Sequence, residues 1–133
     1  MVRRRDGAGF TLIELLVVLV IVAVLAKLAW PSYRQAVYVS NRADATVALL
    51  NVQLAQERWR VNNATYGTLA NLGMSSSSER GKYTIAITAN TATGYTATAT
   101  AAADSEQLND TGCTTFTLTV SGSSETRTPT SCW

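Results

Sequence analysis

The stretch GFTLIELLVVLVIVAVLA, residues 9–26, decides how this chain is organised. Residues 15–26 are an unbroken apolar run, and the segment from Phe10 to Trp30 carries only two charges, Glu14 and Lys27. A helix spans a bilayer with about 20 largely apolar residues. Residues 10–31 are therefore expected to form a hydrophobic transmembrane helix that anchors a more polar, exported head.

The apolar stretch fits three kinds of N-terminal segment. A cleaved secretory signal has an apolar stretch of roughly 7–15 residues and a small-residue cleavage site, for which residues 24–26 (VLA) are a candidate. A plain membrane anchor would keep the three arginines of residues 3–5 in the cytoplasm. Neither accounts for Glu14, because a charge deep in an apolar segment costs about 2.5–3.5 kcal/mol on insertion scales. The third interpretation gives Glu14 a charged partner.

The order Gly9, Phe10, Glu14, a long apolar helix and then Pro31 resembles the class III signal of type IV pilins and their relatives. The resemblance implies that residues 1–9 are a cytoplasmic leader and that a prepilin peptidase cuts between Gly9 and Phe10. It also implies that the new N-terminal Phe10 is methylated and that Pro31 kinks the helix, as in type IVa pilins.

Cleavage at this site would create a positive α-amine four residues before Glu14. Within one helix the amine and the carboxylate meet with poor geometry, whereas two subunits offset along a filament axis bring the amine of one to Glu14 of the next. Because desolvation offsets much of the Coulomb gain, this pair is expected to set the assembly register more than to add stability. The alternative is that Glu14 reaches the cytoplasmic membrane interface.

Lys27 departs from the family pattern, which is apolar at this position. It lies 17 residues beyond Phe10, about 26 Å along a helix and near the far edge of the hydrocarbon. Its ammonium is therefore expected to reach the periplasmic surface while its stem lies along lipid.

The charged residues argue against an enzyme and against a nucleic-acid partner. The chain has no His, which removes Ser/His and Cys/His catalytic pairs and the commonest metal ligand; we expect no enzymatic activity, no metal and no other cofactor. Residues 10–133 hold eight basic and eight acidic side chains, so the processed chain lacks the basic field that supplies most non-specific affinity for DNA. The alternative is a head that binds DNA or another surface. Four basic side chains would then make the contacts: Arg58, Arg60, Arg80 and Lys82.

Apolar residues recur at helical spacing after Pro31 and predict an amphipathic helix over residues 32–62. They form a stripe that we expect to face the core: Ala36, Ala43, Val47, Leu50, Leu54 and Val61. Residues 65–82 are expected to be a loop, and strands with one apolar and one Thr face are predicted over 83–88, 95–100 and 115–120. The resemblance implies the α+β fold of type IV pilins, in which a long N-terminal helix packs on a small antiparallel sheet, here of three or four strands.

Cys113 and Cys132 are the only cysteines and lie on the exported side of the anchor, where disulfides persist. A bridge between them would stabilise a thin core by roughly 3 kcal/mol. A redox or metal role is the alternative, although the sequence has no Cys-x-x-Cys motif. Residues 63–133 thus combine a loop and a sheet with a C-terminal disulfide loop that resembles the one in type IVa pilins.

Shorter matches extend the resemblance to the PilE-type minor pilins of type IVa pilus systems: Ser40-Asn41-Arg42, Gln56-Glu57-Arg58, residues 72–75 (LGMS) and Cys132-Trp133. The resemblance implies a prepilin in the bacterial inner membrane with a periplasmic head, which is processed and assembled into a pilus for motility or adhesion and helps to initiate it. Its partners would be other major and minor pilins, through their N-terminal helices, the prepilin peptidase and the inner-membrane assembly platform. A major pilin, a type II secretion pseudopilin and a DNA- or surface-binding pilin are the alternatives.

Overall fold

The computed structural model describes residues 9–133, so the expected leader lies outside the described residues except for Gly9. Helix α1 (Leu12–Arg60) comes first, and four strands and one short 3-10 helix follow it. The chain divides into two compact units, one up to Arg34 and one from Gln35 to Trp133. Each unit is described by itself below.

The first unit is the apolar part of α1. Thr11 precedes the helix, and its Oγ1 accepts a hydrogen bond from the backbone N of Glu14 at 3.3 Å, which caps one of the free N–H groups of the first turn. Residues 9–34 are all exposed, and the most apolar window has a mean hydropathy of 2.8. The segment is therefore long and apolar enough to cross a membrane.

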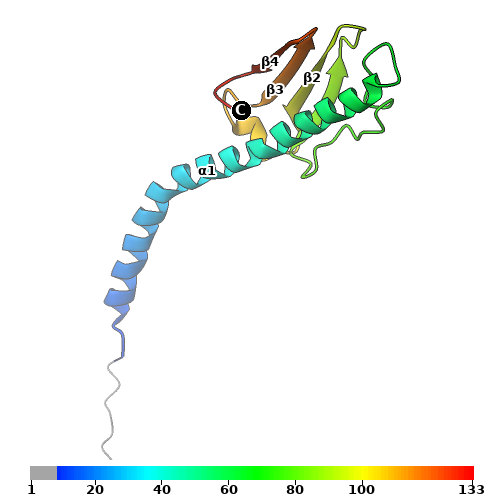
Figure 1. Cartoon of the computed structure of the whole chain (residues 1–133). Helices are drawn as coiled ribbons and strands as arrows, with labels where there is room; N and C mark the ends of the chain where they lie inside the picture. Colours follow the sequence, from blue (N-terminus) through cyan, green and yellow to red (C-terminus); the bar gives the residue numbers. More distant parts are fainter. Residues whose placement is uncertain (1–8) are drawn as a thin grey trace, which may run out of the picture. The chain divides into compact units, whose positions relative to one another are not determined.

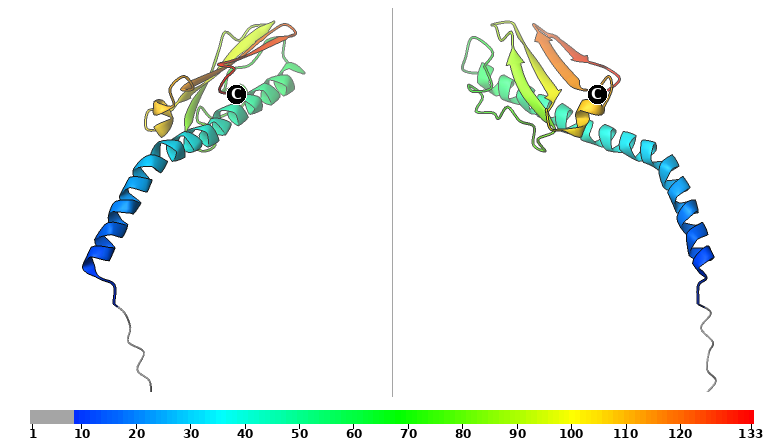
Figure 2. Two further views of the ribbon diagram at one scale, coloured as in Figure 1. Left: turned by 90° about the vertical axis from the view of Figure 1, so that its left-hand side faces the viewer. Right: turned by 180° about the vertical axis from the view of Figure 1, so that it is seen from behind.

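The second unit is a helix laid on a four-stranded antiparallel sheet, as Figures 1 and 2 show. The strands are β1 (Tyr83–Thr88), β2 (Gly94–Ala101), β3 (Thr115–Ser121) and β4 (Ser124–Thr128), and the 3-10 helix η1 (Glu106–Asn109) lies between β2 and β3. Their order in the sheet is β1-β2-β3-β4, so each strand pairs with its neighbours in sequence. The predicted α+β pilin fold is confirmed.

Alternation along the strands separates a core face from a Thr face. In the register of the sheet Ile85 lies opposite Ala99, and Ala99 lies opposite Phe116, so all three point to the same side. They form the core with two fully buried residues of α1, Leu49 and Val52. The core lies wholly within residues 45–133, and the head therefore has its own hydrophobic interior.

The predicted core stripe of α1 is wrong. All six of its residues, Ala36, Ala43, Val47, Leu50, Leu54 and Val61, are exposed. The buried residues of the helix lie on the other side and include three polar ones: Asn41, Asp44 and Gln56. These polar side chains are tolerated in the interior because each finds hydrogen-bond partners in η1 or in the loops, which hydrophobic periodicity does not reveal.

Candidate assembly surface

The residues of the expected processing site precede the helix. Gly9 and Phe10 lie outside α1, the Phe10 side chain is 84% exposed, and a Cβ built on Gly9 would meet no atom within 4 Å. Among residues 9–133, nothing therefore crowds the peptide bond between them.

Glu14 lies in the first turn of α1 and Pro31 lies inside the helix. Glu14 and Lys27 are both exposed, and in the described part of the chain neither side chain forms an ion pair. Their charges in an apolar segment therefore call for partners outside the chain or for contact with water. The Thr11 cap was missed in the sequence, although Thr-x-x-Glu is the pattern of a capping box.

The head half of α1 presents a second apolar surface. We define the helix stripe as the exposed apolar residues on its outer side, together with Val61 directly after its last residue: Ala36, Val39, Ala43, Val47, Leu50, Leu54 and Val61. Their spacings of three, four or seven residues place them on one side of a helix. Val39, Leu54 and Val61 are 51%, 55% and 79% exposed. An apolar row of this kind on an isolated chain is typical of a surface that is covered in an assembly.

Buried polar contacts hold the opposite side of α1 to η1. Arg42 donates two hydrogen bonds to the carboxylate of Asp110, each at 2.8 Å, and these bonds raise the pKa of Arg42. Asn41 donates to Oε1 of the buried Gln107 at 3.2 Å. The amide of Gln107 in turn donates to the Tyr83 hydroxyl at 2.9 Å. Bidentate and networked hydrogen bonds of this kind fix the orientation of α1 relative to η1. The helix stripe therefore belongs to a rigidly held part of the helix.

Asp44 ties the loop before β1 to the helix. Its Oδ2 accepts from Ser78 Oγ at 2.6 Å and from the backbone N of Lys82 at 3.3 Å, and its Oδ1 accepts from the backbone N of Arg80 at 3.1 Å. Both carboxylate oxygens are thus engaged. The sequence offered no signal for this contact, because the partners lie 34 or more residues apart.

The four basic residues considered as a DNA contact do not form one patch. Lys82 pairs with Glu106 at 2.9 Å, and its backbone, like that of Arg80, is held by Asp44. Arg58 is 14 residues beyond Asp44 in the same helix, a separation of about 21 Å. Arg60 stacks over the Tyr66 ring at 4.9 Å. The structure therefore divides these residues between the two ends of the head helix.

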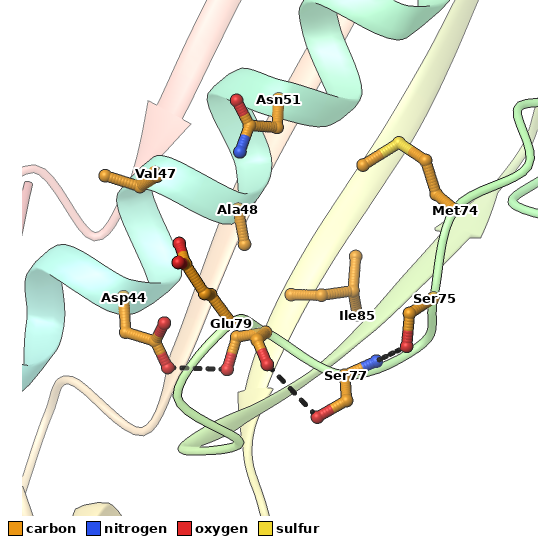
Figure 3. Close-up of a pocket in the computed structure, with 10 residues that line it drawn as sticks. Asp44, Val47, Ala48, Asn51, Met74, Ser75, Ser77, Glu79 and Ile85 are labelled. Carbon is orange, nitrogen blue, oxygen red and sulfur yellow. Dashed lines mark hydrogen bonds between the residues drawn. The ribbon is translucent and has the colours of Figure 1, made fainter.

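Several surface hollows lie beside α1, and two of them bear on function. One, of about 230 Å³, lies between the helix and the loop before β1 (Figure 3). Its walls include the apolar side chains of Val47, Ala48, Met74 and Ile85. The other, of about 300 Å³, is lined by Ala55, Arg58, Trp59, Asn71 and Leu72. Among the described residues no group of three acidic, Cys or His side chains is arranged to hold a metal ion.

Two family profiles match the sequence. Residues 4–26 match the prokaryotic N-terminal methylation motif. Residues 31–117 match the family described as type IV minor pilin ComP, DNA uptake sequence receptor. The chain belongs to this type IV pilin family. The methylation motif coincides with the segment in which the sequence predicted the class III signal.

A curated relative is the type IV wide pilus major component PilA4 of Thermus thermophilus, which is 36% identical over 76 residues. The match covers 54% of this chain and 58% of the relative, so the chain spans somewhat more than half the length of that pilin. The relative is a major component, whereas the family description names a minor pilin. The shared conclusion is a type IV pilin, a class of structural protein, with an apolar N-terminal helix suited to a membrane and then to a filament.

Proposed function

We propose that the chain is a minor subunit of a type IV pilus. It is inserted in the inner membrane through residues 10–31, cut between Gly9 and Phe10 by a prepilin peptidase and methylated at Phe10. An inner-membrane platform then assembles it with other major and minor pilins into a pilus, which it helps to initiate, for adhesion or motility. The observation that carries the proposal is the exposed apolar surface along α1.

This surface has two parts that suit a filament. The run of residues 15–26 is apolar on all sides and exposed, which suits lipid before assembly and packing among other helices after it. The helix stripe is apolar on one side only, and the other side is committed to the core of the head. The stripe is not needed for the core of the head, because that core is formed by other residues. An exposed apolar stripe of this kind favours lateral contact with other helices.

N-terminal mass spectrometry of the membrane-extracted protein tests the processing step. The expected product begins at methylated Phe10. A product that begins at Lys27 would instead identify an ordinary secreted protein. Quantitative mass spectrometry of sheared pili then tests the minor role: we expect far fewer copies of this chain than of the most abundant pilin, and equal or greater abundance would identify a major pilin.

Deletion of the gene tests the initiating role separately. We expect few or no surface pili in the deletion strain, although the other pilins are still made and processed. Normal numbers of pili would contradict initiation, and retention of the chain in a pseudopilus of a type II secretion system would overturn the choice of organelle.

DNA binding is the second candidate, because the matching family is described as a DNA uptake sequence receptor. The charges weigh against a broad phosphate-binding surface, since residues 35–133 carry six basic and seven acidic side chains. The hollow beside Arg58 and Trp59 still offers a cation and an aromatic ring together, a combination found in single-strand binding sites. Gel shifts of the head, residues 32–133, across a salt series decide the matter: salt-sensitive binding that Arg58→Ala removes would favour the receptor, and the absence of binding would exclude it.

A further inference from the structure

We propose that the hollow between α1 and the loop before β1 receives the Lys27 side chain of a second copy of this chain, with its ammonium paired to Glu79. The inference rests on the proposed function in that the chain is a filament subunit, and it requires that copies of this minor subunit lie next to one another where the pilus is initiated. It adds a specific contact between copies and a register for their helices.

The hollow has the composition that a lysine side chain requires. Val47, Ala48, Met74 and Ile85 provide apolar walls, and Asp44 and Glu79 contribute carboxylates. Figure 3 shows Glu79 on the loop with its side chain extending toward α1. A lysine places a long apolar stem along apolar surface and keeps its charge at a polar edge. The walls suit the stem, and the acidic edge suits the ammonium.

Glu79 is the carboxylate available to an incoming cation. Both oxygens of Asp44 already accept hydrogen bonds from the loop. Within the part of the chain that the structure describes, the exposed Glu79 side chain makes no hydrogen bond or ion pair. Arg80 lines a smaller adjoining hollow together with Asp44 and Glu79. The two hollows together are thus bordered by two carboxylates, Asp44 and Glu79, and one cation, Arg80. The net negative charge favours a cationic guest.

The hollow opens next to the surface on which another apolar helix would pack. Val47 belongs to the helix stripe and also lines the hollow, and Ala43 of the stripe lines the adjoining one. An apolar helix seated on the stripe therefore passes beside the opening, and a lysine on its flank can enter it.

Lys27 is the lysine that meets this description. It follows directly after the apolar run of residues 15–26 and is exposed. In a membrane its ammonium can reach water, but the same residue packed among helices in a filament is left with a charge that needs a partner. Glu79 of another copy supplies that partner from beside the stripe.

The contact sets a register for two parallel helices. When Lys27 of the second copy lies level with Asp44 to Val47, the two helices are offset by 17 to 20 residues. The Lys27 contact uses Glu79 in the head of the other copy, whereas the proposed amine–Glu14 contact uses the first residues of the processed chain. The two contacts therefore use different groups, and each can be tested without the other.

Zero-length carbodiimide cross-linking of sheared pili tests the contact directly, because the reagent joins an ammonium to a carboxylate only at ion-pair distance. Two full-length alleles are produced in one strain, one with Glu79→Gln and one with Lys27→Arg. Arginine keeps the positive charge but is not coupled by the reagent. A cross-linked peptide that joins Lys27 of the first allele to Glu79 of the second is the expected product, and it can form only between copies.

Charge exchange in the same strain gives a second readout. Glu79→Lys is expected to lower incorporation into pili about tenfold, which corresponds to about 1.4 kcal/mol, and combination with Lys27→Glu is expected to restore it. Glu57→Lys is the matched control, since Glu57 is also exposed but does not line the hollow; we expect normal incorporation. Pili that contain the chain but link Lys27 to Glu57 or to another protein would overturn the inference and leave the proposed function intact. Absence of the chain from pili would overturn both.

Discussion

The side-chain amide of Gln56 forms two hydrogen bonds with the backbone of Gly67. Nε2 of Gln56 donates to the Gly67 carbonyl at 2.7 Å, and the Gly67 N–H donates to Oε1 of Gln56 at 2.8 Å. Gln56 is fully buried. Its amide satisfies both backbone groups of Gly67, as a neighbouring strand would in a sheet. The contact fixes the start of the long loop against the last turns of α1.

Gln56→Ala is expected to lower the free energy of unfolding of the head by about 2–3 kcal/mol, because both backbone groups of Gly67 lose their buried partner. Urea denaturation of residues 32–133 measures the change. Gln53→Ala is a suitable control, since the Gln53 amide donates to Glu125 in an exposed setting and should matter little. Equal effects of the two substitutions would contradict the special role of Gln56.

Two buried tyrosines are expected to respond in opposite ways to loss of the hydroxyl. The Tyr95 hydroxyl is buried, and no hydrogen-bond partner for it lies among the described residues; burial raises its pKa. Tyr95→Phe should therefore raise the free energy of unfolding by about 1 kcal/mol, the cost of an unsatisfied buried group. Thermal unfolding of the head at neutral pH measures it.

Tyr83 is the matched comparison, because its hydroxyl accepts a hydrogen bond from Gln107 at 2.9 Å. Tyr83→Phe leaves the amide of Gln107 with one acceptor fewer and should lower the free energy of unfolding by about 1 kcal/mol. A loss of stability in Tyr95→Phe as large as that in Tyr83→Phe would show that the Tyr95 hydroxyl has a partner in solution.

Glu125 gives the head a pH-dependent contact between α1 and β4. Hydrogen bonds from Gln53 and then from Arg127 lower the pKa of Glu125. Because the pKa is lower in the folded state, the contribution is present above the unfolded pKa of about 4.3 and is lost as the pH falls through the folded value. We expect the small stability difference between the unmodified head and Glu125→Gln to shrink as the pH falls below the unfolded pKa of about 4.3 and to disappear at pH values below the folded pKa. A difference that stays constant over this range would contradict the assignment.

The disulfide between Cys113 and Cys132 joins the segment before β3 to the C-terminus. It closes a loop with a sequence separation of 19, for which chain entropy predicts about 3 kcal/mol. Replacement of both cysteines by Ala should lower the free energy of unfolding by about this amount in urea denaturation. Reduction of the unmodified head should have the same effect, and a head indifferent to reduction would show that the bridge constrains little.

Local patterns predicted the strands well and the buried face of the helix badly. The alternation of Tyr83, Ile85 and Ile87 with Thr and Ala depends only on neighbours in sequence, and β1 occupies the predicted residues. The sequence does not predict β4, because its five residues, SETRT, are all exposed and include no apolar residue that could alternate with polar ones. It exists because β3 offers a free edge, which no local pattern contains.

The buried face of α1 was predicted wrongly for a related reason. Val47 and Leu54 have the spacing of core residues, whereas the face that is truly buried carries Asn41, Asp44 and Gln56. Those three are acceptable inside because Gln107, Ser78 and Gly67 form hydrogen bonds with them across sequence separations of 66, 34 and 11 residues, which helical periodicity does not reveal. The apolar residues left outside are the ones that we assign to contacts between subunits, so the failed expectation and the assembly surface have one cause.

Glu14→Ala tests the assembly surface at the N-terminal end of α1. The substitution keeps the Thr11 cap, because the cap uses the backbone N–H of residue 14, and it makes the apolar segment easier to insert. We therefore expect normal membrane levels and normal processing at Gly9, but strongly reduced incorporation into pili, because the α-amine at Phe10 loses its counter-charge in the neighbouring subunit. Quantification of the processed chain in membranes and in sheared pili separates the two steps. Glu57→Ala serves as the control, since Glu57 is exposed on the same helix; unimpaired incorporation of Glu14→Ala would refute the registry role.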